Sequence, residues 1–274
     1  MNMEYSVLMS VYRNTKDSEL KQCMDSVFVQ TPAPSEIVVV LDGPVSDGVS
    51  EYLLGLEREG KIKTVPLETN VGLGNALAEG AKHCKYEWIV RMDSDDICAP
   101  DRMEKQTDYL EKHPDVDVLG SNIAEFTDDV NNIVSIRAVP EDHEAICKYM
   151  KSRCPFNHMT VIMRKSVLEA AGGYMDWLYN EDSYLWARMY LAGAKFANIA
   201  ENLVFARIDA STFRRRGGYR YYKSERDLFK FMYSNGIIGY AEYIKAKIVR
   251  FVVQVMMPNG IRQWFFRTFA REKK

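Results

Sequence analysis

The chain has 274 residues, 47% of them hydrophobic, and a formal net charge of −2, which predicts one domain with a substantial core and an appendage. Its five cysteines form no C-x-x-C pair, which argues against a disulfide framework or a zinc site and favours reduced, cytosolic thiols. The N-terminus lacks a cationic leader, and no apolar run reaches the roughly 18–20 residues of a spanning helix. We therefore expect neither a signal peptide nor a transmembrane segment.

Strands and helices alternate in the N-terminal half. Short β-branched apolar runs predict buried strands, and apolar residues at helical spacing predict helices. Such alternation predicts an α/β fold with a mostly parallel central sheet and helices on both faces. In chain order we expect strand 4–12, helix 17–31 capped by Asp17 or Ser18, strand 36–42, helix 48–58, strand 62–67, helix 72–84, strand 86–93, a helix over 101–113 opened by Pro100, and strand 115–121.

After about residue 120 this alternation ends. We expect extended segments and turns over residues 121–140 and strands at 157–163 and 195–206. A helix is predicted from near Asn180, and cationic helices from Gly217 onward. No internal repeat or low-complexity tract is present, so the second half completes the same domain and then leads into the appendage.

Three carboxylates, Asp93, Asp95 and Asp96, directly follow the predicted strand 86–93. Ligands of open α/β sheets bind at the carboxyl ends of strands. A divalent cation would relieve the repulsion, and Mg²⁺ or Mn²⁺ held by one or two carboxylates usually also binds substrate phosphates. The cluster thus indicates a phosphorylated ligand. The alternative is a solvated turn whose last aspartate caps the following helix.

Polar and aromatic side chains also follow the other predicted strands. Ser10 and Tyr12 end the first strand, and Asp42 ends the second. A tyrosine and an aspartate at one sheet edge could stack on a nucleobase and hydrogen-bond to it. The alternatives are a packing role for Tyr12 and a turn role for Asp42.

A second acidic pair, Glu181 and Asp182, opens the helix predicted near Asn180. Acids at this position commonly complement the positive end of a helix, which is the simpler interpretation. Upstream, His158 is either a structural histidine or a group near a ligand. Composition and spacing leave both questions open.

Six segments of the chain, taken in order, resemble those of a known family. They are residues 6–14, 36–43, 69–80, 91–106, 157–174 and 180–186. The set resembles family 2 of the inverting nucleotide-sugar glycosyltransferases, which have the GT-A fold, over roughly residues 5–210. It is most similar to bacterial transferases that build capsular and exopolysaccharide repeat units, including the amylovoran-type β-galactosyltransferases. The resemblance implies a hexose donor of the UDP-sugar class, with UDP-galactose as the first choice, and a lipid-diphosphate-linked saccharide acceptor.

The resemblance also implies roles for residues of the nucleotide side. Ser10 and Tyr12 would lie at the nucleotide, with Tyr12 stacked near uracil, and Asp42 would bind the base or ribose. Asn70 and Gly72 match the N-x-G turn that approaches the nucleotide. The chain departs from many relatives at Gly43, where a second acid is common, at Thr69, where a cation is common, and at Ala78, where asparagine is common.

For the reacting groups, the resemblance assigns the D-x-D pair to Asp93 and Asp95. Asp95 would be the main ligand of Mn²⁺ or Mg²⁺, Asp93 a metal or ribose contact, and Asp96 a helix cap or a residue behind the ligands. Asp182 would be the general base, with Glu181 beside it at the acceptor. Asn157 and His158 would lie near the acceptor or the diphosphate, because residues 157–160, Asn-His-Met-Thr, match an N-H-x-[ST] stretch of that family.

Charge separates the appendage from the rest. Residues 214–274 carry fifteen Lys or Arg against four Asp or Glu, whereas residues 1–213 carry 21 against 34. We therefore divide the chain into a catalytic domain, 1–213, with a nucleotide part to about 120 and an acceptor part from 121, and a basic helical extension, 214–274. The acidic body argues against a nucleic-acid partner.

The extension is predicted to be amphipathic. Pro258 separates two apolar stripes, and cations that include Lys245, Lys247 and Arg250 flank the first of them. Such helices suit an anionic membrane surface, so we expect peripheral attachment at the cytoplasmic face of the membrane; the alternative is packing on the protein. The stripes are Ile244, Ile248, Phe251, Val252 and Val255, then Ile261, Trp264, Phe265 and Phe269.

Two other functions compete with the transferase. A haloacid-dehalogenase-type phosphatase would use residues 93–97 as its nucleophile strand, but the cluster lies far from the N-terminus. A non-catalytic membrane scaffold would use the basic extension and keep the acids as helix caps. A Rossmann dehydrogenase is disfavoured because residues 72–77 lack the third glycine of the fingerprint.

Overall fold

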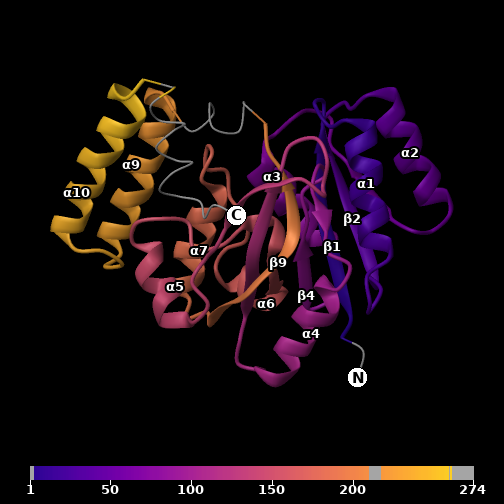
Figure 1. Ribbon diagram of the computed structural model, residues 1–274, viewed down its shortest axis with the longest axis horizontal. Coiled ribbons are helices and arrows are strands. Elements are labelled where there is room, and N and C mark those ends of the chain that lie inside the picture. The colour runs from indigo at the N-terminus through magenta and orange to yellow at the C-terminus, as the bar shows by residue number, and fades with distance from the viewer. Residues whose placement is uncertain (1–2, 210–216, 259, 261–274) are drawn as a thin grey trace.

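A nine-stranded sheet forms the centre of the molecule (Figure 1). The computed structural model describes residues 3–209, 217–258 and 260. Half of the sheet consists of neighbouring parallel strands in the order β3, β2, β1, β4, and β8, β6, β9 and β5 continue it with mixed directions. The strands are β1 (Tyr5–Tyr12), β2 (Glu36–Asp42), β3 (Lys63–Pro66), β4 (Trp88–Arg91), β5 (Ile97–Cys98), β6 (Val118–Phe126), β7 (Ile133–Arg137), β8 (Ile162–Arg164) and β9 (Phe196–Arg207).

Helices cover both faces of the sheet, as the alternating sequence predicts. On one face α1, α2 and α4 pack against alternate residues of β1 and β2, such as Val7 and Val39. On the other face α3 packs against the residues between them, such as Leu8 and Val40, and α5, α6, α7 and α9 share the same core. The bounds are α1 (Asp17–Phe28), α2 (Asp47–Arg58), α3 (Leu73–His83), α4 (Arg102–Lys112), α5 (His143–Met150), α6 (Lys165–Ala170), α7 (Glu181–Leu191), α9 (Tyr219–Ser234) and α10 (Tyr240–Phe251).

The two described C-terminal helices differ in how they are buried. The apolar side of α9 completes the second core with Leu228, Phe229 and Met232. Outside it lies α10, at the left of Figure 1, which continues into one π-helical turn, Val252–Met256. Both helices were predicted. The stripe that begins at Ile261 lies outside the described residues.

Three local predictions are corrected. Residues 157–163 do not form one strand, because a 3₁₀ turn, His158–Thr160, precedes the short β8. Pro100 does not open α4; Asp101 is the N-cap, so the proline lies just outside the helix. The N-cap of α1 is Lys16, and Asp17 lies in the first turn, where its charge complements the helix dipole. The parallel half of the sheet is as expected, whereas the other half adds antiparallel pairs.

Candidate active site

The carboxyl ends of β1, β2 and β4 meet where the strand order changes direction. From β1 the chain continues to β2 and β3 on one side, whereas β4 joins β1 on the other. Tyr12 and Asp42, the last residues of their strands, are direct partners across β1 and β2. Tyr12 is 40% exposed. Such a switch point is where open α/β sheets bind nucleotides, so the register brings the predicted nucleotide residues together.

Asp42 is buried and holds the predicted N-x-G turn. Its carboxylate accepts hydrogen bonds from Asn70 Nδ2 at 2.8 Å, from the Val71 amide at 2.6 Å and from the Gly72 amide at 3.2 Å. The structure therefore places Asp42, Asn70 and Gly72 in one hydrogen-bonded unit. That Asp42 itself contacts a base or ribose stays a prediction.

Gly43, which follows Asp42, makes this close contact with the turn possible. Its φ is 76°, and a Cβ atom on it would lie 2.5 Å from the backbone nitrogen of Asn70. Neither condition suits a residue with a side chain. A glycine at position 43 thus has a physical reason: the backbone at Asn70 passes too close for a side chain.

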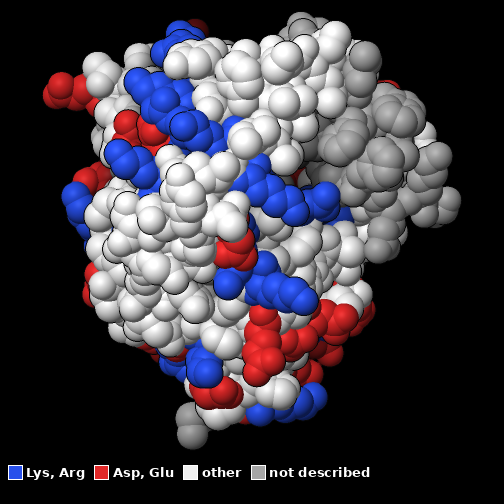
Figure 2. Space-filling view, turned by 90° about the vertical axis from the view of Figure 1, so that its left-hand side faces the viewer, with Lys and Arg blue, Asp and Glu red and all other residues white. Residues whose placement is uncertain are grey.

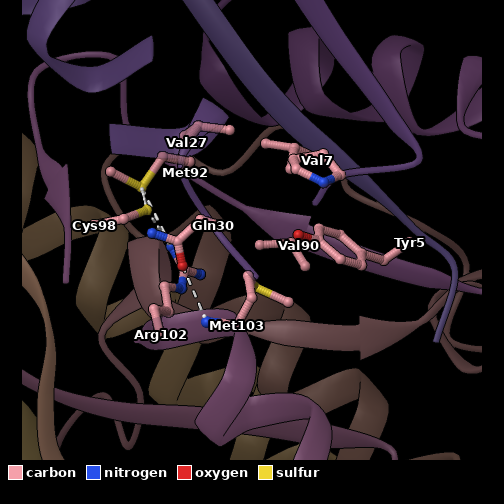
Figure 3. Close-up of a pocket in the computed structure, with 10 residues that line it drawn as sticks. Tyr5, Val7, Val27, Gln30, Val90, Met92, Cys98, Arg102 and Met103 are labelled. Atoms are coloured by element: carbon pink, nitrogen blue, oxygen red, sulfur yellow. Dashed lines mark hydrogen bonds between the residues drawn. The ribbon is translucent and has the colours of Figure 1, made fainter. Parts of the chain in front are cut away.

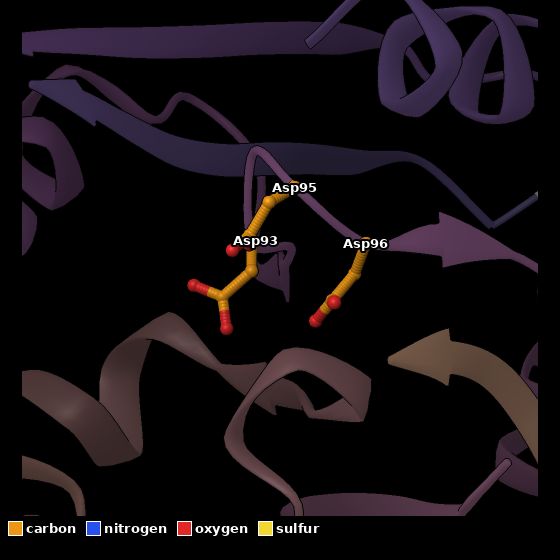
Figure 4. A group of neighbouring side chains, drawn as sticks. All are labelled: Asp93, Asp95 and Asp96. Atoms are coloured by element: carbon orange, nitrogen blue, oxygen red, sulfur yellow. The ribbon is translucent and has the colours of Figure 1, made fainter. Parts of the chain in front are cut away.

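The three predicted carboxylates converge in the loop between β4 and β5. A ligand oxygen from each of Asp93, Asp95 and Asp96 lies within 4.8 Å of the others. Figure 4 shows Asp93 and Asp96 pointing the same way from this loop. An all-oxygen set of this size suits Mg²⁺ or Mn²⁺, so the residues present fit a divalent cation.

A protein cation already compensates part of this charge. Arg91, the last residue of β4, is buried and forms an ion pair with Asp93. The sequence analysis overlooked Arg91, although it stands two residues before the first aspartate. The available signal was an arginine at the end of an apolar strand and next to a cluster of acids, because a cation that is buried there needs a partner.

Asp96 faces β9. Its Oδ1 accepts a hydrogen bond from the Arg207 amide at 2.8 Å, and the Arg207 Nε donates to the Asp95 carbonyl at 3.2 Å. The helix-cap role predicted for Asp96 is therefore wrong, since the N-cap of α4 is Asp101, five residues later. Asp96 instead ties the acidic loop to the end of β9.

Burial and mutual repulsion disfavour the charged forms of these acids. Desolvation, then the charge of Asp93, raises the pKa of Asp95 to about 6. Burial, then the charges of Asp95 and Asp93, raises the pKa of Asp96 well above its ordinary value. A bound cation would reverse this effect because it favours deprotonated ligands.

A second buried arginine, Arg102, supports the end of β4 from which the acidic loop starts. Arg102 of α4 donates to the Arg91 carbonyl at 3.0 Å and to Gln106 Oε1 at 3.0 Å. Figure 3 shows it beside Met92, Cys98 and Gln30, in a compact environment without an acid among the residues drawn. Arg102 therefore fixes the end of β4 through the Arg91 carbonyl. Neutral acceptors, this carbonyl and the Gln106 amide oxygen, take the hydrogen bonds of its guanidinium.

The second acidic pair opens α7, as predicted. The Asp182 Oδ1 accepts from the Ser183 amide and hydroxyl, and its Oδ2 accepts from the Cys154 thiol at 3.2 Å. Burial, then the charge of Asp182, raises the pKa of Glu181 to about 7, and the charges of Arg91 and Asp93 also act on Glu181. The pair thus lies within electrostatic range of the first cluster.

Close packing joins the nucleotide turn to this acidic pair. A Cβ on Gly74, in the first turn of α3, would lie 2.5 Å from the Met175 carbonyl and 3.3 Å from the Glu181 Cβ. The glycine therefore lets α3, which follows the Asn70–Gly72 turn, approach the start of α7. Both halves of the site meet across this contact.

Asn157 and His158 have protein partners. The buried Asn157 donates to the Ser121 carbonyl at 2.8 Å and accepts from Arg137 at 2.6 Å. His158 Nε2 lies 2.9 Å from the Tyr174 hydroxyl, and burial, then the charge of Arg91, lowers the pKa of His158 well below its ordinary value. These contacts support a neutral scaffold role; contact with acceptor or diphosphate stays a prediction.

Comparison with known proteins gives the family. The model of glycosyl transferase family 2 matches residues 6–170. An uncharacterized glycosyltransferase of Haemophilus influenzae is 41% identical over 98% of this chain and 100% of its own length. The amylovoran biosynthesis glycosyltransferase AmsE of Erwinia amylovora is 35% identical over 96% and 97%. The UDP-Gal:alpha-D-GlcNAc-diphosphoundecaprenol beta-1,3-galactosyltransferase of Escherichia coli is 33% identical over 98% and 97%.

Solved structures support the same fold. TarS 1-349 of S. aureus, in complex with UDP-GlcNAc, matches 98% of this chain and 76% of its own, with 17% identity and a TM-score of 0.66. A mannosyltransferase of Pyrobaculum calidifontis, in complex with GDP-Man and Mn²⁺, matches 96% and 72%, with 14% identity and a TM-score of 0.65. At this identity the likeness shows the GT-A fold alone. The phosphatase and scaffold alternatives are wrong, because the chain belongs to glycosyl transferase family 2 and is a glycosyltransferase.

Proposed function

We propose that this glycosyltransferase moves a hexose, with galactose as the first choice, from a UDP-sugar to a lipid-diphosphate-linked saccharide, with inversion and in dependence on Mn²⁺ or Mg²⁺. The observation that carries the proposal is that two separate acidic clusters, in different environments, lie close to each other. Asp93, Asp95 and Asp96 converge on one potential cation position, whereas Glu181 and Asp182 stand at a separate helix start. Relatives of similar length act in amylovoran biosynthesis and on GlcNAc-diphosphoundecaprenol.

The chemistry divides between these groups. Inversion takes one in-line displacement, in which the acceptor oxygen bonds to the anomeric carbon as the diphosphate leaves. The Asp182 carboxylate, which Ser183 and Cys154 hold in position, would take the proton of the acceptor hydroxyl. Bound at Asp95 and Asp93, a divalent cation would supply positive charge for the leaving diphosphate. Tyr12 and the turn fixed by Asp42 would hold the nucleoside.

A ligand panel tests donor and metal together. We expect UDP-galactose with Mn²⁺ to raise the melting temperature more than UDP-glucose, UDP-GlcNAc or GDP-mannose does, because a ligand stabilises the state that it binds. Transfer to a GlcNAc-diphosphate lipid is then measured with the best donor. Equal shifts with all four sugars, or transfer that persists in EDTA, would contradict the donor or the metal assignment.

The pH dependence of the same panel has a defined sign. The pKa values of Asp95 and Glu181, at about 6 and about 7, lie above those of unfolded carboxyls. Between roughly pH 4 and 7 the folded protein therefore binds more protons than the unfolded chain, and its metal-free stability falls as pH rises. Mn²⁺ requires the deprotonated ligands, so its stabilising shift should grow as pH rises through about 6. A shift that shrinks instead would contradict binding at Asp95.

We further propose that α10 attaches the enzyme to the cytoplasmic face of an anionic membrane. No helix of the described residues is long and apolar enough to cross a bilayer. The outward side of α10 and its π turn instead exposes a row of large apolar side chains, and Figure 2 shows this side of the molecule, with Lys and Arg beside broad uncharged areas. The row comprises Ile248, Val249, Phe251, Val252, Val255 and Met256.

The cations around this row divide into two kinds. Lys245 and Lys247 are exposed beside the apolar side chains, where each could contribute about 1 kcal/mol at an anionic surface. Arg250, predicted to join them, instead pairs with Glu225 at 3.1 Å and donates to the Ser152 carbonyl at 2.7 Å. Arg250 thus fastens α10 to the protein and leaves the apolar row facing outward.

Liposome co-sedimentation tests the attachment. We expect the full chain to bind vesicles with anionic lipid at low salt and to lose binding at high salt, because the surface charges are then screened. Ile248→Asp with Val252→Asp should abolish binding without unfolding the protein, since both side chains are exposed. Leu54→Asp, an equally exposed apolar position on α2 at the other side of the molecule, is the matched control. Unchanged sedimentation of the α10 double variant would refute the anchor.

A further inference from the structure

A strained residue stands immediately before the helix of the acidic pair. Tyr179 has φ 66°, and it is the single non-glycine residue with positive φ that the described part of the chain contains. This conformation is unfavourable for a bulky side chain, so surrounding contacts must hold it. Asn180 follows as the N-cap of α7, and Glu181 and Asp182 are the first helical residues. The backbone at Tyr179 therefore sets the direction in which the acids leave the loop.

One serine of α9 holds both neighbours of Tyr179. The Ser224 hydroxyl donates to the Leu178 carbonyl and accepts from Asn180 Nδ2 at 3.0 Å. Ser224 and Asn180 are both buried, at 8% and 5% exposed, so water competes little for these bonds. A single hydroxyl thus bridges the residues on either side of the strained position.

Further contacts fasten the same loop to α9. The Trp177 Nε1 donates to the Ser224 carbonyl at 3.2 Å, and the Trp177 ring lies 4.2 Å from that of Tyr184 in α7. Tyr184 in turn meets Phe231 of α9 edge to face at 4.9 Å. The loop is therefore held between α7 and α9. The Asn180 amide closes the turn by donating to the Trp177 carbonyl at 3.1 Å, and the Ser224 hydroxyl adds the side-chain bonds to both neighbours of Tyr179.

We propose that Ser224 is a positioning residue for the catalytic acids, which it fixes by holding Tyr179 in the left-handed conformation. The proposal rests on the proposed function of Glu181 and Asp182. It also places α9 functionally with the catalytic domain, C-terminal to the boundary at 213, and leaves α10 as the surface helix. The hydroxyl itself touches no reacting atom; it acts through Asn180 and the start of α7.

The first test compares single variants in a transfer assay over a range of donor concentrations up to saturation. Ser224→Ala should lower kcat roughly 10- to 100-fold, the scale of misplacing a catalytic group by about an ångström, with little change in the KM for the donor. Ser224→Thr keeps the hydroxyl and should restore most of the activity. Ser234→Ala, an exposed serine of the same helix, is the matched control. An unchanged kcat in Ser224→Ala, or an equal loss in Ser224→Thr with the fold intact, would overturn the proposal.

A double-mutant cycle tests the mechanism. Tyr179→Asn occupies the left-handed region more readily, so its turn should persist without the serine. In that background Ser224→Ala should cost roughly 3-fold or less in kcat, a non-additive result. Additive losses would show that Ser224 acts independently of Tyr179. Asp182→Asn, assayed in parallel, separates the base role of Asp182 from the positioning role of Ser224. If Asp182→Asn stays active, the base assignment is wrong. If Asp182→Asn is inactive and Ser224→Ala is normal, only the positioning role is wrong.

Discussion

Asp95→Ala is expected to reduce sugar transfer by roughly 10²–10³-fold or more while the protein stays folded. Asp95 lies at the surface of the loop, although neighbouring groups partly desolvate its carboxylate, which belongs to the three that converge on one potential cation position. Arg207 holds the loop through the backbone carbonyl of Asp95, which an alanine retains. The substitution therefore removes charge and a metal ligand without releasing the loop from β9. Transfer rates with Mn²⁺, and the melting temperature of the metal-free variant, measure the two effects separately.

Asp96→Ala provides the opposite pattern. It removes the acceptor for the Arg207 amide and leaves this partly buried donor without its protein partner, which costs about 1–3 kcal/mol of stability at most. We expect it to lower the melting temperature more than Asp95→Ala does and to reduce transfer less. If Asp95→Ala keeps near-normal activity and that activity survives EDTA, the cation does not bind where we propose.

The spacing of residues along the chain predicted those parts of the site that lie at strand ends. Tyr12 and Asp42 meet because parallel neighbours place their carboxyl ends at the same edge, and each terminates its strand. Asp93, Asp95 and Asp96 follow β4 directly, so their proximity is local. Both results depend only on where apolar runs stop, which a sequence displays.

Contacts between distant segments could not be predicted in this way. Ser224 and Asn180 are 44 positions apart, and Asp42 meets the amide of Val71 29 positions on. Whether Arg250 faces lipid or Glu225 depends on how α10 packs against α9, and both helices have the same amphipathic, basic character in the sequence. Composition predicted helices there, but only packing distinguishes a covered apolar side from an exposed one.

Asp182→Asn is expected to lower transfer by roughly 10²–10⁴-fold, the usual share of general-base catalysis. The amide fits the site, since its oxygen can keep the hydrogen bonds from Ser183 and its nitrogen can face the sulfur of Cys154, a weak acceptor. Donor and Mn²⁺ binding, measured by calorimetry, should therefore persist while the chemical step fails.

Glu181→Gln is the matched control, because it makes the same change of carboxylate to amide one residue away. Glu181 has a pKa of about 7 because of its burial and the charge of Asp182, so it is partly protonated near neutral pH and would serve poorly as a fixed negative charge. We expect Glu181→Gln to raise the acceptor KM more than it lowers kcat, whereas Asp182→Asn should lower kcat at every pH. Near-normal turnover of Asp182→Asn at any pH, with Glu181→Gln inactive, would identify Glu181 as the base. The base would then still come from the first turn of α7.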